Sequence, residues 1–245
     1  MKTPLEIISL SKDYDGKNAV RDISFKLNHN EIIGILGPNG CGKTTTIGMI
    51  LGLLKPSKGK VLVNGVEIED QRIEILNNIN FISPYIELPK KLTVRQNLEV
   101  YGRLYDVKNL KKKIDSISEE LRLYEIIDKI TGELSSGQKN RVSLAKSIIN
   151  NPSVLLLDEP TASLDPETGD FVRKFLENYQ KEKRTSILLA SHNMTEVERL
   201  CSFVIMMNKG SIIDKGKPKE LIKKHNRKNM EEVFLKLTRE KYEFK

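Results

Sequence analysis

Short hydrophobic runs separated by polar residues fill the first third of the chain, a pattern that predicts β-strands. These strands are expected at residues 5–10, 23–27 and 31–36. A glycine-rich turn follows the third run, and the apolar spacing then becomes that of a helix over residues 43–53. Lys55-Pro56 is expected to end this helix, because proline disfavours helical backbone at the residue before it.

The middle of the chain changes from strands to helices. Runs at residues 60–63 and 65–68 flank Asn64-Gly65, a dipeptide typical of tight β-hairpin turns. From about residue 84 to residue 150, apolar residues recur at the spacing of one helix face. They include Leu98, Tyr101, Leu104, Ile114, Ile117 and Leu121. This part is therefore predicted to be mostly helical.

The remainder of the chain returns to alternating strands and helices. A wholly apolar run at residues 154–157 precedes a predicted helix at 166–180, strands at 186–189 and 203–207, and short charged helices from about residue 217. Strands that alternate with helices favour a mainly parallel sheet covered on both faces. The predicted fold class is α/β, with a mainly parallel sheet, a small antiparallel β part and an inserted α-helical subdomain.

Composition narrows the class of protein. Of 245 residues, 38% are hydrophobic and 30% are charged, proportions that suit a soluble globular chain rather than a disordered one. No apolar run approaches the ~18–20 residues of a membrane helix, and charged residues from Lys2 to Asp13 interrupt any leader peptide. Two cysteines cannot frame a disulfide-rich secreted fold, and no Cys/His spacing indicates a metal site.

The strongest motif follows the run at residues 31–36. It matches G-x-x-x-x-G-K-[ST] between a predicted strand and a predicted helix, the context in which this motif binds phosphate. Its glycines let backbone N–H groups turn inward around an anion, and the helix N-terminus adds its positive end. The lysine would bridge the β- and γ-phosphates of a nucleotide, and the following threonine would bind Mg²⁺. The candidate phosphate-binding residues are Gly37, Pro38, Asn39, Gly40, Cys41, Gly42, Lys43, Thr44 and Thr45.

Two alternatives stay open at this motif. An ordinary glycine-rich turn would need no ligand, although the flanking strand and helix argue against it. Cys41 is either a small residue that fits the loop or a reactive thiol, because the positive end of a helix lowers the pKa of a cysteine.

A second candidate site follows the run at residues 154–157, which ends in Asp158-Glu159. A buried parallel strand delivers its last residues to the carboxyl edge of the sheet, where α/β proteins bind ligands. Asp158 and Thr44 are the expected Mg²⁺ ligands, and Glu159 is the expected general base on the attacking water. By itself the pair would also suit a solvated acidic turn.

A third motif, Leu134-Ser135-Ser136-Gly137-Gln138, lies between the first two in the sequence. By itself, Ser-Ser-Gly is typical of a helix cap. With the other two motifs around it, the chain resembles the ATP-binding subunits of ATP-binding cassette (ABC) transporters from about residue 5 to residue 214. The resemblance implies a P-loop NTPase core that binds ATP and Mg²⁺ and hydrolyses ATP.

The resemblance also implies roles for further residues. In this family the signature serine and glycine, here Ser135 and Gly137, contact the γ-phosphate of ATP held by the opposite subunit, with Ser136 and Gln138 beside them. Tyr14 matches the aromatic residue that stacks on adenine, and His192 matches the switch histidine that binds the γ-phosphate. Residues 163–165 match the loop that crosses the dimer. In isolation, Tyr14 would more often be a packing residue and His192 a surface histidine.

Two positions depart from the family pattern. Ser136 stands where the signature usually has glycine. The neighbouring contact residues of the signature are present, so activity is expected to survive this change. At Ser83-Pro84 most relatives carry a glutamine that touches Mg²⁺ and the attacking water. Either Ser83 or a water takes its place, or coupling uses other residues of the segment, such as Tyr85 and Glu87.

One chain contains one phosphate motif and one signature motif. The resemblance therefore implies a head-to-tail pair with a second copy of the chain or a similar ATPase subunit. ATP would close the pair and hydrolysis would open it, as a two-state switch. Separate transmembrane permease subunits would receive this motion, with the chain in the cytoplasm on the inner face of the plasma membrane.

Residues 229–235 resemble a tail segment common in exporter ATPases of the ABC-2 type, although a generic amphipathic helix would look the same. Export is therefore the expected direction of transport. The competing class is a non-transport ABC ATPase serving DNA repair, chromosome organisation or translation, which usually carries two cassettes or long coiled-coil insertions. A non-hydrolysing, nucleotide-gated adaptor is a third alternative, suggested only by the missing glutamine.

Charge separates the tail from the body of the chain. Residues 1–214 are predicted to form the ATP-binding domain, with a helical subdomain inserted at about 84–150, and residues 215–245 to form a charged helical extension. The extension holds 11 basic and 5 acidic side chains, which supplies most of the formal net charge of +8. The body is thus nearly neutral, and no nucleic acid is expected as a partner. The tail is either a solvated helix or a segment that lies close to an anionic membrane surface.

Overall fold

The computed structural model describes residues 2–84 and 86–239, and the chain divides into two compact units. The first unit comprises Met1–Ile75 and Ser186–Lys245, and the second comprises Leu76–Thr185. Tyr85, one of the residues considered for coupling, lies outside the described residues. Each unit is described by itself below.

The first unit contains a four-stranded sheet in the order β2-β1-β4-β5. Its strands are β1 (Leu5–Tyr14), β2 (Lys17–Leu27), β4 (Lys58–Val63) and β5 (Val66–Glu67). All pairings in it are antiparallel, with three register shifts between β1 and β2 and one between β1 and β4. Asn64 and Gly65 both have positive φ between paired residues Val63 and Val66, so the predicted hairpin turn is confirmed.

A second group of strands in the first unit carries the parallel pairing. Its order is β10-β9-β3-β8, formed by β3 (Ile32–Leu36), β8 (Ser186–Ser191), β9 (Phe203–Asn208) and β10 (Ser211–Gly216). β3 pairs in parallel with both β8 and β9, and β10 returns antiparallel to β9. Every residue of β3 and β8 is buried. This burial explains why both strands are mostly apolar, and the parallel pairing confirms the expected α/β class with a small antiparallel part.

The helix after β3 is shorter than predicted. α1 spans Lys43–Ile50, whereas the sequence pattern indicated residues 43–53. Gly52 adopts φ 63°, and the backbone N–H groups of Leu53 and Leu54 both turn back to the carbonyl of Gly48. A left-handed glycine after the last helical turn ends the helix in this way, several residues before Pro56.

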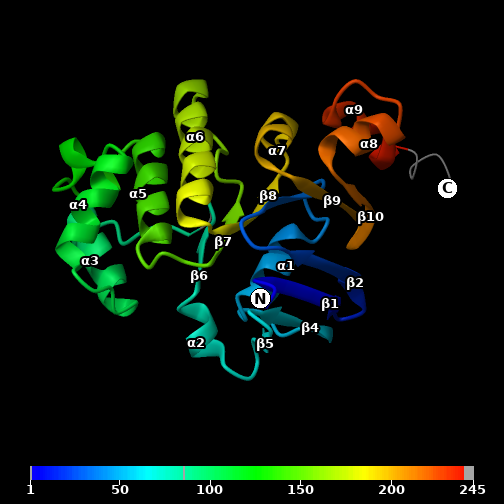
Figure 1. Cartoon of the computed structure of the whole chain (residues 1–245), viewed down its shortest axis with the longest axis horizontal. Helices are drawn as coiled ribbons and strands as arrows, with labels where there is room; N and C mark the ends of the chain where they lie inside the picture. Colours follow the sequence, from blue (N-terminus) through cyan, green and yellow to red (C-terminus); the bar gives the residue numbers. More distant parts are fainter. Residues whose placement is uncertain (1, 85, 240–245) are drawn as a thin grey trace. The chain divides into compact units, whose positions relative to one another are not determined.

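Three helices complete the first unit. α7 (Met194–Leu200) joins β8 to β9, and the C-terminal helices α8 (Pro218–Lys224) and α9 (Met230–Arg239) confirm the predicted helical tail. Figure 1 shows α8 and α9 side by side near the end of the chain. Met230 and Val233 of α9 are buried, so one face of this helix packs against the unit.

The described residues of the second unit form two parallel strands and four α-helices. The strands are β6 (Ile79–Ile82) and β7 (Val154–Asp158), and the helices are α3 (Val94–Leu104), α4 (Leu110–Glu120), α5 (Ser136–Ile148) and α6 (Pro166–Lys183), with short 3₁₀ turns η1 (Tyr124–Ile126) and η2 (Thr131–Glu133). In Figure 1, α3, α4 and α5 lie together, coloured green. A short helix, α2 (Arg72–Leu76), stands at the sequence boundary between the units.

Several elements were not predicted from the sequence. β6, β10 and the short helices α2 and α7 each span seven residues or fewer, so periodicity has little length in which to appear. Among the described helices, none is long and apolar enough to cross a membrane.

Candidate functional site

The phosphate loop, residues 37–44 of the first unit, follows β3 directly and is shaped by its glycines. A Cβ on Gly37 would lie 2.3 Å from Cys41 Sγ and 2.5 Å from the carbonyl oxygen of Met207, so only glycine fits there. Gly40 and Gly42 adopt φ 77° and φ 108°, a backbone region that side chains disfavour. The loop therefore curls tightly because three of its positions carry no side chain.

Lys43 begins helix α1 and turns back into the loop. Its Nζ donates to the carbonyl oxygens of Gly37 at 2.7 Å and Pro38 at 3.4 Å, and the residue is only 6% exposed. Gly42 occupies the N-cap position of α1 and has no side chain with which to cap the first N–H groups. These N–H groups, the helix dipole and a nearly buried ammonium converge where an anion would lie.

Cys41 packs inside the loop rather than facing solvent. It is buried, its backbone N–H donates to Pro38, and its carbonyl accepts from the N–H of Gly210. Burial raises the pKa of the Cys41 thiol, more than the positive charge of Lys43 lowers it. Burial and the raised pKa argue against a reactive thiol and favour the alternative that Cys41 is the small residue that fits against Gly37.

Tyr14 lies at the end of β1, where β1 turns into β2. Its side chain is 43% exposed, and Lys12 Nζ stands 5.0 Å from the centre of its ring. β2 itself approaches the phosphate loop, because a Cβ on Gly42 would meet the carbonyl oxygen of Ala19 at 2.7 Å. The structure thus places an exposed aromatic face on a strand pair that contacts the loop.

His192 follows β8 and shares a sheet edge with the phosphate loop. Leu36 of β3 pairs with Ser191 of β8, so Gly37 and His192 each come directly after paired residues. The turn is held by its neighbours: Ser191 Oγ donates to Glu196 Oε2 at 2.8 Å and accepts from the N–H of Asn193. Asn193 in turn caps α7 by accepting from the N–H of Glu196.

Sequence reasoning missed these three supporting residues, Ser191, Asn193 and Glu196. The spacing Asn-x-x-Glu directly after a strand is a helix-start signal, and it was available at residues 193–196. Buried Glu196 is remote from the other motifs in sequence, so only the hydrogen bonds show that it supports the turn that carries His192.

In the second unit, Asp158 and Glu159 lie at the carboxyl end of β7. Asp158 is the last residue of that strand and is 2% exposed, whereas Glu159 begins the following turn with φ 51°. The turn is closed by Ala162 N–H, which donates to the carbonyl of Glu159. Asn140 of α5 donates to the carbonyl of Pro160 at 2.7 Å, so the acidic turn is fixed to the helix of the signature motif.

The signature motif forms the start of α5. Ser135 Oγ accepts from the N–H of Gln138 while Gln138 Oε1 accepts from the N–H of Ser135, a reciprocal capping box. A hydroxyl that accepts one hydrogen bond keeps its own hydrogen to donate to a phosphate oxygen. Both interpretations of this serine, a helix cap and a ligand contact, are therefore compatible.

Gly137 of the signature motif lies close to helix α6, which leaves little space for a side chain. A Cβ there would lie 3.2 Å from Thr168 Cγ2 on helix α6. Asp165, at the N-cap of α6, accepts from the N–H of Thr168, and this hydrogen bond holds the pKa of Asp165 below its ordinary value. The loop at residues 163–165 and the signature thus meet at the starts of α5 and α6.

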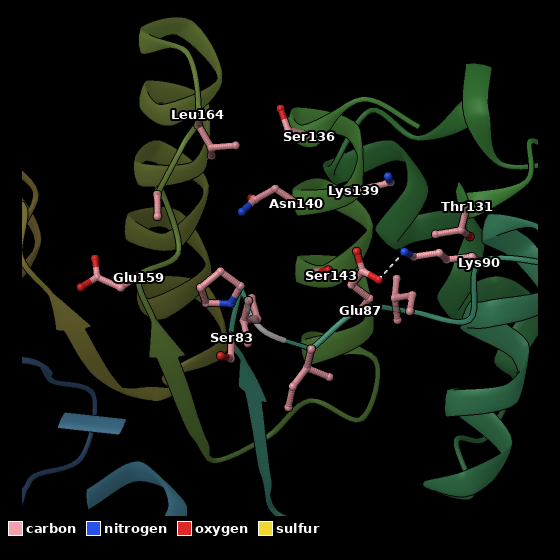
Figure 2. A pocket seen from close by; sticks show the side chains of 15 residues that line it. Ser83, Glu87, Lys90, Thr131, Ser136, Lys139, Asn140, Ser143, Glu159 and Leu164 are labelled. Atoms are coloured by element: carbon pink, nitrogen blue, oxygen red, sulfur yellow. Dashed lines mark ion pairs between the residues drawn. The ribbon is translucent and has the colours of Figure 1, made fainter. Parts of the chain in front are cut away.

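A cavity of about 210 Å³ joins several of these residues within the second unit. Figure 2 shows Glu159 and Ser83 at the ends of β7 and β6, with Ser136, Lys139, Asn140 and Ser143 on the wall formed by α5. Glu87 lines the opposite part and pairs with Lys90 at 2.7 Å, an ion pair that holds the pKa of Glu87 below its ordinary value. Ser83 and Glu87, the residues considered in place of the missing glutamine, therefore share a cavity with the candidate base.

The residues present fit the groups that the motifs imply. The phosphate loop offers backbone N–H groups and a buried ammonium to a phosphate chain. Thr44 in the first unit and Asp158 in the second each carry an oxygen donor of the hard kind that Mg²⁺ prefers. Among residues 2–84 and 86–239, no group of three or more His, Cys, Asp and Glu side chains forms a metal site.

Comparison with known proteins decides the family. The profile of the ABC transporter family matches residues 20–162 of the chain. The chain belongs to the ABC transporter family. As an ABC protein of this kind it is an ATP-binding subunit, and it is an ATPase that energises a transporter.

Individual relatives agree with this assignment. The ABC chain is 34% identical over 220 residues, 89% of each protein, to the ABC transporter ATP-binding protein NatA of Bacillus subtilis. It is 38% identical to the Nod factor export ATP-binding protein I of Rhizobium johnstonii, over 89% of this chain and 70% of that protein. The structure of CbiO1 from Clostridium perfringens, part of the ABC transporter complex CbiONQ, superimposes with a TM-score of 0.81 at 32% identity, covering 91% and 92% of the chains.

The family also fixes the general way of working. ABC ATP-binding subunits dimerise and work with transmembrane permease components. Such subunits associate with the membrane-embedded permease from its cytoplasmic side.

Proposed function

We propose that this chain is the ATPase subunit of an exporter and acts as one half of a head-to-tail pair with two shared ATP sites. The observation that carries the proposal is the division of parts: one phosphate loop in the first unit and one helix-capping signature in the second. If the signature serves the partner's nucleotide, one chain alone completes no site. The partner is a second copy of the chain or a similar ATPase subunit.

The nucleotide is ATP, held by the phosphate loop and by Tyr14. Gly37, Gly40 and Gly42 shape the loop, and Lys43 supplies the charge for the β- and γ-phosphates. Support for Tyr14 comes from its exposed ring on the strand pair that contacts Gly42. Magnesium, with Thr44 and Asp158 as its protein ligands, would neutralise charge that develops on the phosphates.

Hydrolysis relies on Glu159 and His192. Glu159 leaves the buried strand β7 with a left-handed backbone, which turns its side chain out of the strand. As general base it would take a proton from the attacking water. His192 lies on a turn that the hydrogen bonds of Ser191 hold in place. It would hydrogen-bond the γ-phosphate and lose this contact after hydrolysis. Ser135 and Gly137 would contact the γ-phosphate of ATP bound by the partner, so cleavage would release the interface.

Export is the proposed direction of transport. Similarity to the Nod factor export ATP-binding protein supports it, as does the resemblance of residues 229–235 to exporter tails. In this chain α9 presents buried Met230 and Val233 to its unit, and Met230 N–H binds the Glu198 carboxylate of α7. The tail segment is therefore a packed part of the ATPase.

The proposed organisation follows the sequence boundaries. Residues 1–214 form the ATP-binding domain, with a helical subdomain inserted at about 84–150, and residues 215–245 form the charged extension. The protein would lie in the cytoplasm, at the inner face of the plasma membrane, bound to separate permease subunits. Nucleic acid is not a proposed partner, because the excess positive charge belongs to the extension.

Direction and partner can be tested together. An affinity-tagged copy of the chain is expressed in the organism from which it comes. It is then purified from detergent-solubilised membranes together with the proteins bound to it. Recovery of a polytopic membrane protein is expected, and inside-out vesicles containing the complex should accumulate cargo in the presence of ATP and Mg²⁺. Uptake by right-side-out vesicles instead would indicate an importer, and recovery of no membrane protein would contradict the transporter assignment.

A further inference from the structure

Lys146 is a partly buried cation on helix α5 that the proposed ATPase mechanism does not use. Its Nζ donates to Asn80 Oδ1 at 3.2 Å and to the carbonyl oxygen of Phe81 at 3.3 Å, both on β6. The same Nζ lies 4.8 Å from the centre of the Phe81 ring and 5.2 Å from that of Tyr101 on α3. One ammonium group therefore contacts three elements of the second unit.

The described surroundings of this ammonium leave little room for water. It lines a cavity of about 20 Å³ together with Ser83, Ser143 and Tyr101, a space that holds about one water molecule rather than a hydration shell. Among the described residues, no carboxylate forms an ion pair with Lys146. Burial accordingly lowers the pKa of Lys146 from its ordinary value of 10.5 to about 8.

The groups that face Lys146 are few. Among the described residues, β6 presents the neutral Asn80 and Phe81, and α3 presents Tyr101, a titratable side chain. From the segment after β6, uncharged Ser83, Ile86 and Leu88 reach the small cavity. The charged Glu87 lines the larger cavity and is paired with Lys90. On α5 itself, Lys139 also faces the larger cavity.

The position of Lys146 connects two functional features. Its helix begins at the signature motif, with Ser135 as the N-cap. The strand that it holds ends at Ile82, directly before Ser83, and Ser83 shares the larger cavity with Glu159. Asn80 strengthens the same connection, because its Nδ2 donates to Asn150 Oδ1 at 3.0 Å and to the Lys146 carbonyl at 3.4 Å.

We propose that Lys146 is a positioning residue for ATP hydrolysis: its charged ammonium fixes the end of β6, and thereby Ser83 directly after it, against the signature helix. The proposal rests on the ATPase activity and on the proposed role of the cavity residues. A cation–π contact and a charged hydrogen bond to a carbonyl both weaken when the amine loses its proton. Hydrolysis should then depend on the protonation of a residue that contacts neither the nucleotide nor the attacking water.

The test is the pH profile of the ATPase rate in the purified complex, from about pH 7 to about pH 9.5, at saturating MgATP. Wild type is expected to lose about threefold in kcat with a midpoint near pH 8, with little change in KM. Lys146→Arg, which stays charged, should lack this alkaline fall. Lys146→Met, which is never charged, should be slower by about fivefold at pH 7 and have a flat profile.

Two controls separate this role from a structural one. Burial also lowers the pKa of Lys113, but this lysine donates to Asn151 rather than to β6. Lys113→Met should therefore keep the wild-type pH profile. Tyr101→Phe should keep the alkaline fall as well, because the ring remains. Lys146→Met should melt no lower than wild type at pH 7, since replacing an unpaired buried charge by an apolar side chain is neutral or stabilising.

The outcomes either support or overturn the proposal. A folded Lys146→Met protein with the wild-type rate at pH 7, or with the wild-type alkaline fall, would overturn it. So would an alkaline fall that persists in Lys146→Arg or disappears in Tyr101→Phe. If Lys146→Arg fails to fold because its larger guanidinium does not fit, the test rests on Lys146→Met. A slower rate at pH 7 and a flat pH profile in Lys146→Met, without a lower melting temperature, then support the proposal.

Discussion

The phosphate loop of the first unit and the signature-and-cavity region of the second unit are built in different ways. In the phosphate loop the backbone makes the site, and a Cβ on Gly37 would collide with both Cys41 and Met207. In the second unit side chains make the site: Ser135 and Gln138 cap each other, and Asn140 fixes the acidic turn. The first region leaves almost no choice of residue, whereas the second is defined by contacts that several residue types can make.

This difference explains where the chain departs from its family. The phosphate loop matches its motif at every defined position, and at Gly37 and Gly42 a Cβ would collide with neighbouring atoms. Ser136 and Ser83, the two departures, both line the wall of an open cavity in the second unit. An extra hydroxyl or a shorter side chain can be accommodated there, since neither position requires a special backbone conformation.

The largest expected effect comes from a side chain alone. Glu159→Gln should lower the ATPase rate by about 10²–10⁴-fold, because the amide cannot accept a proton from the attacking water. ATP binding should persist, and the ATP-bound pair should accumulate as a dimer. The ATPase rate is measured by phosphate release, ATP binding by nucleotide titration, and the dimer by size-exclusion chromatography.

The matched control for this change is Glu119→Gln, which removes an exposed carboxylate from α4 in the same unit. It should leave turnover unchanged. If Glu159→Gln hydrolyses ATP at the wild-type rate, Glu159 is not the general base. If it loses ATP binding, this side chain also supports the fold of the site.

A backbone change in the phosphate loop should affect both binding and stability. Gly37→Ala is expected to cost about 1–3 kcal/mol of folding free energy through overpacking, and to weaken ATP binding by about tenfold or more. Gly40→Ala, whose Cβ would meet nothing within 4 Å, should cost only the strain of its positive φ, about 1 kcal/mol. Thermal melts and nucleotide titration compare the two variants. Equal losses in both would show that crowding against Cys41 and Met207 is not the reason for glycine at residue 37.

A smaller effect should separate capping from ligand contact in the second unit. Ser135→Ala and Thr93→Ala both break a capping box, the first on α5 and the second on α3, and each should cost about 1 kcal/mol of stability. Only Ser135→Ala should also lower the ATPase rate, by about fivefold, because its hydroxyl is the one proposed to contact phosphate. A rate loss of the same size in Thr93→Ala would reduce Ser135 to a helix cap.

The smallest effect is expected outside both regions. Burial by itself raises the pKa of Asp214, but hydrogen bonds from Lys224 and His225 outweigh it and hold the pKa below its ordinary value of 3.8. A carboxylate of this kind stabilises the fold above pH 3.8, and the contribution disappears as the pH falls through the lower folded-state pKa.

Asp214→Asn should therefore lower the unfolding free energy by about 1 kcal/mol at neutral pH and leave the ATPase rate unchanged. The difference from wild type should vanish at about pH 2. Chemical denaturation at several pH values measures it. A difference that is independent of pH would mean that the charge of Asp214 is not what stabilises the C-terminal helices.

Prediction from the sequence succeeded where one local rule decides the outcome. Unbroken apolar runs predicted β3, β7 and β8, and Asn64-Gly65 predicted a hairpin turn. It was less accurate where two local signals compete: Pro56 was expected to end α1, but Gly52 ends it earlier by adopting a left-handed backbone. Short elements such as β6 and α7 were missed because they are too brief for a period to show.

The sequence by itself determined the family, the α/β class and the residues of the three motifs, because each motif is a compact local pattern tied to one strand or helix end. Only the tertiary structure decided the state of Cys41, the bracing of His192 by Glu196, and the cavity shared by Ser83, Ser136 and Glu159. Only it placed the Lys146 ammonium against β6. These features depend on which distant side chains become neighbours and lose water, and local sequence patterns do not record either.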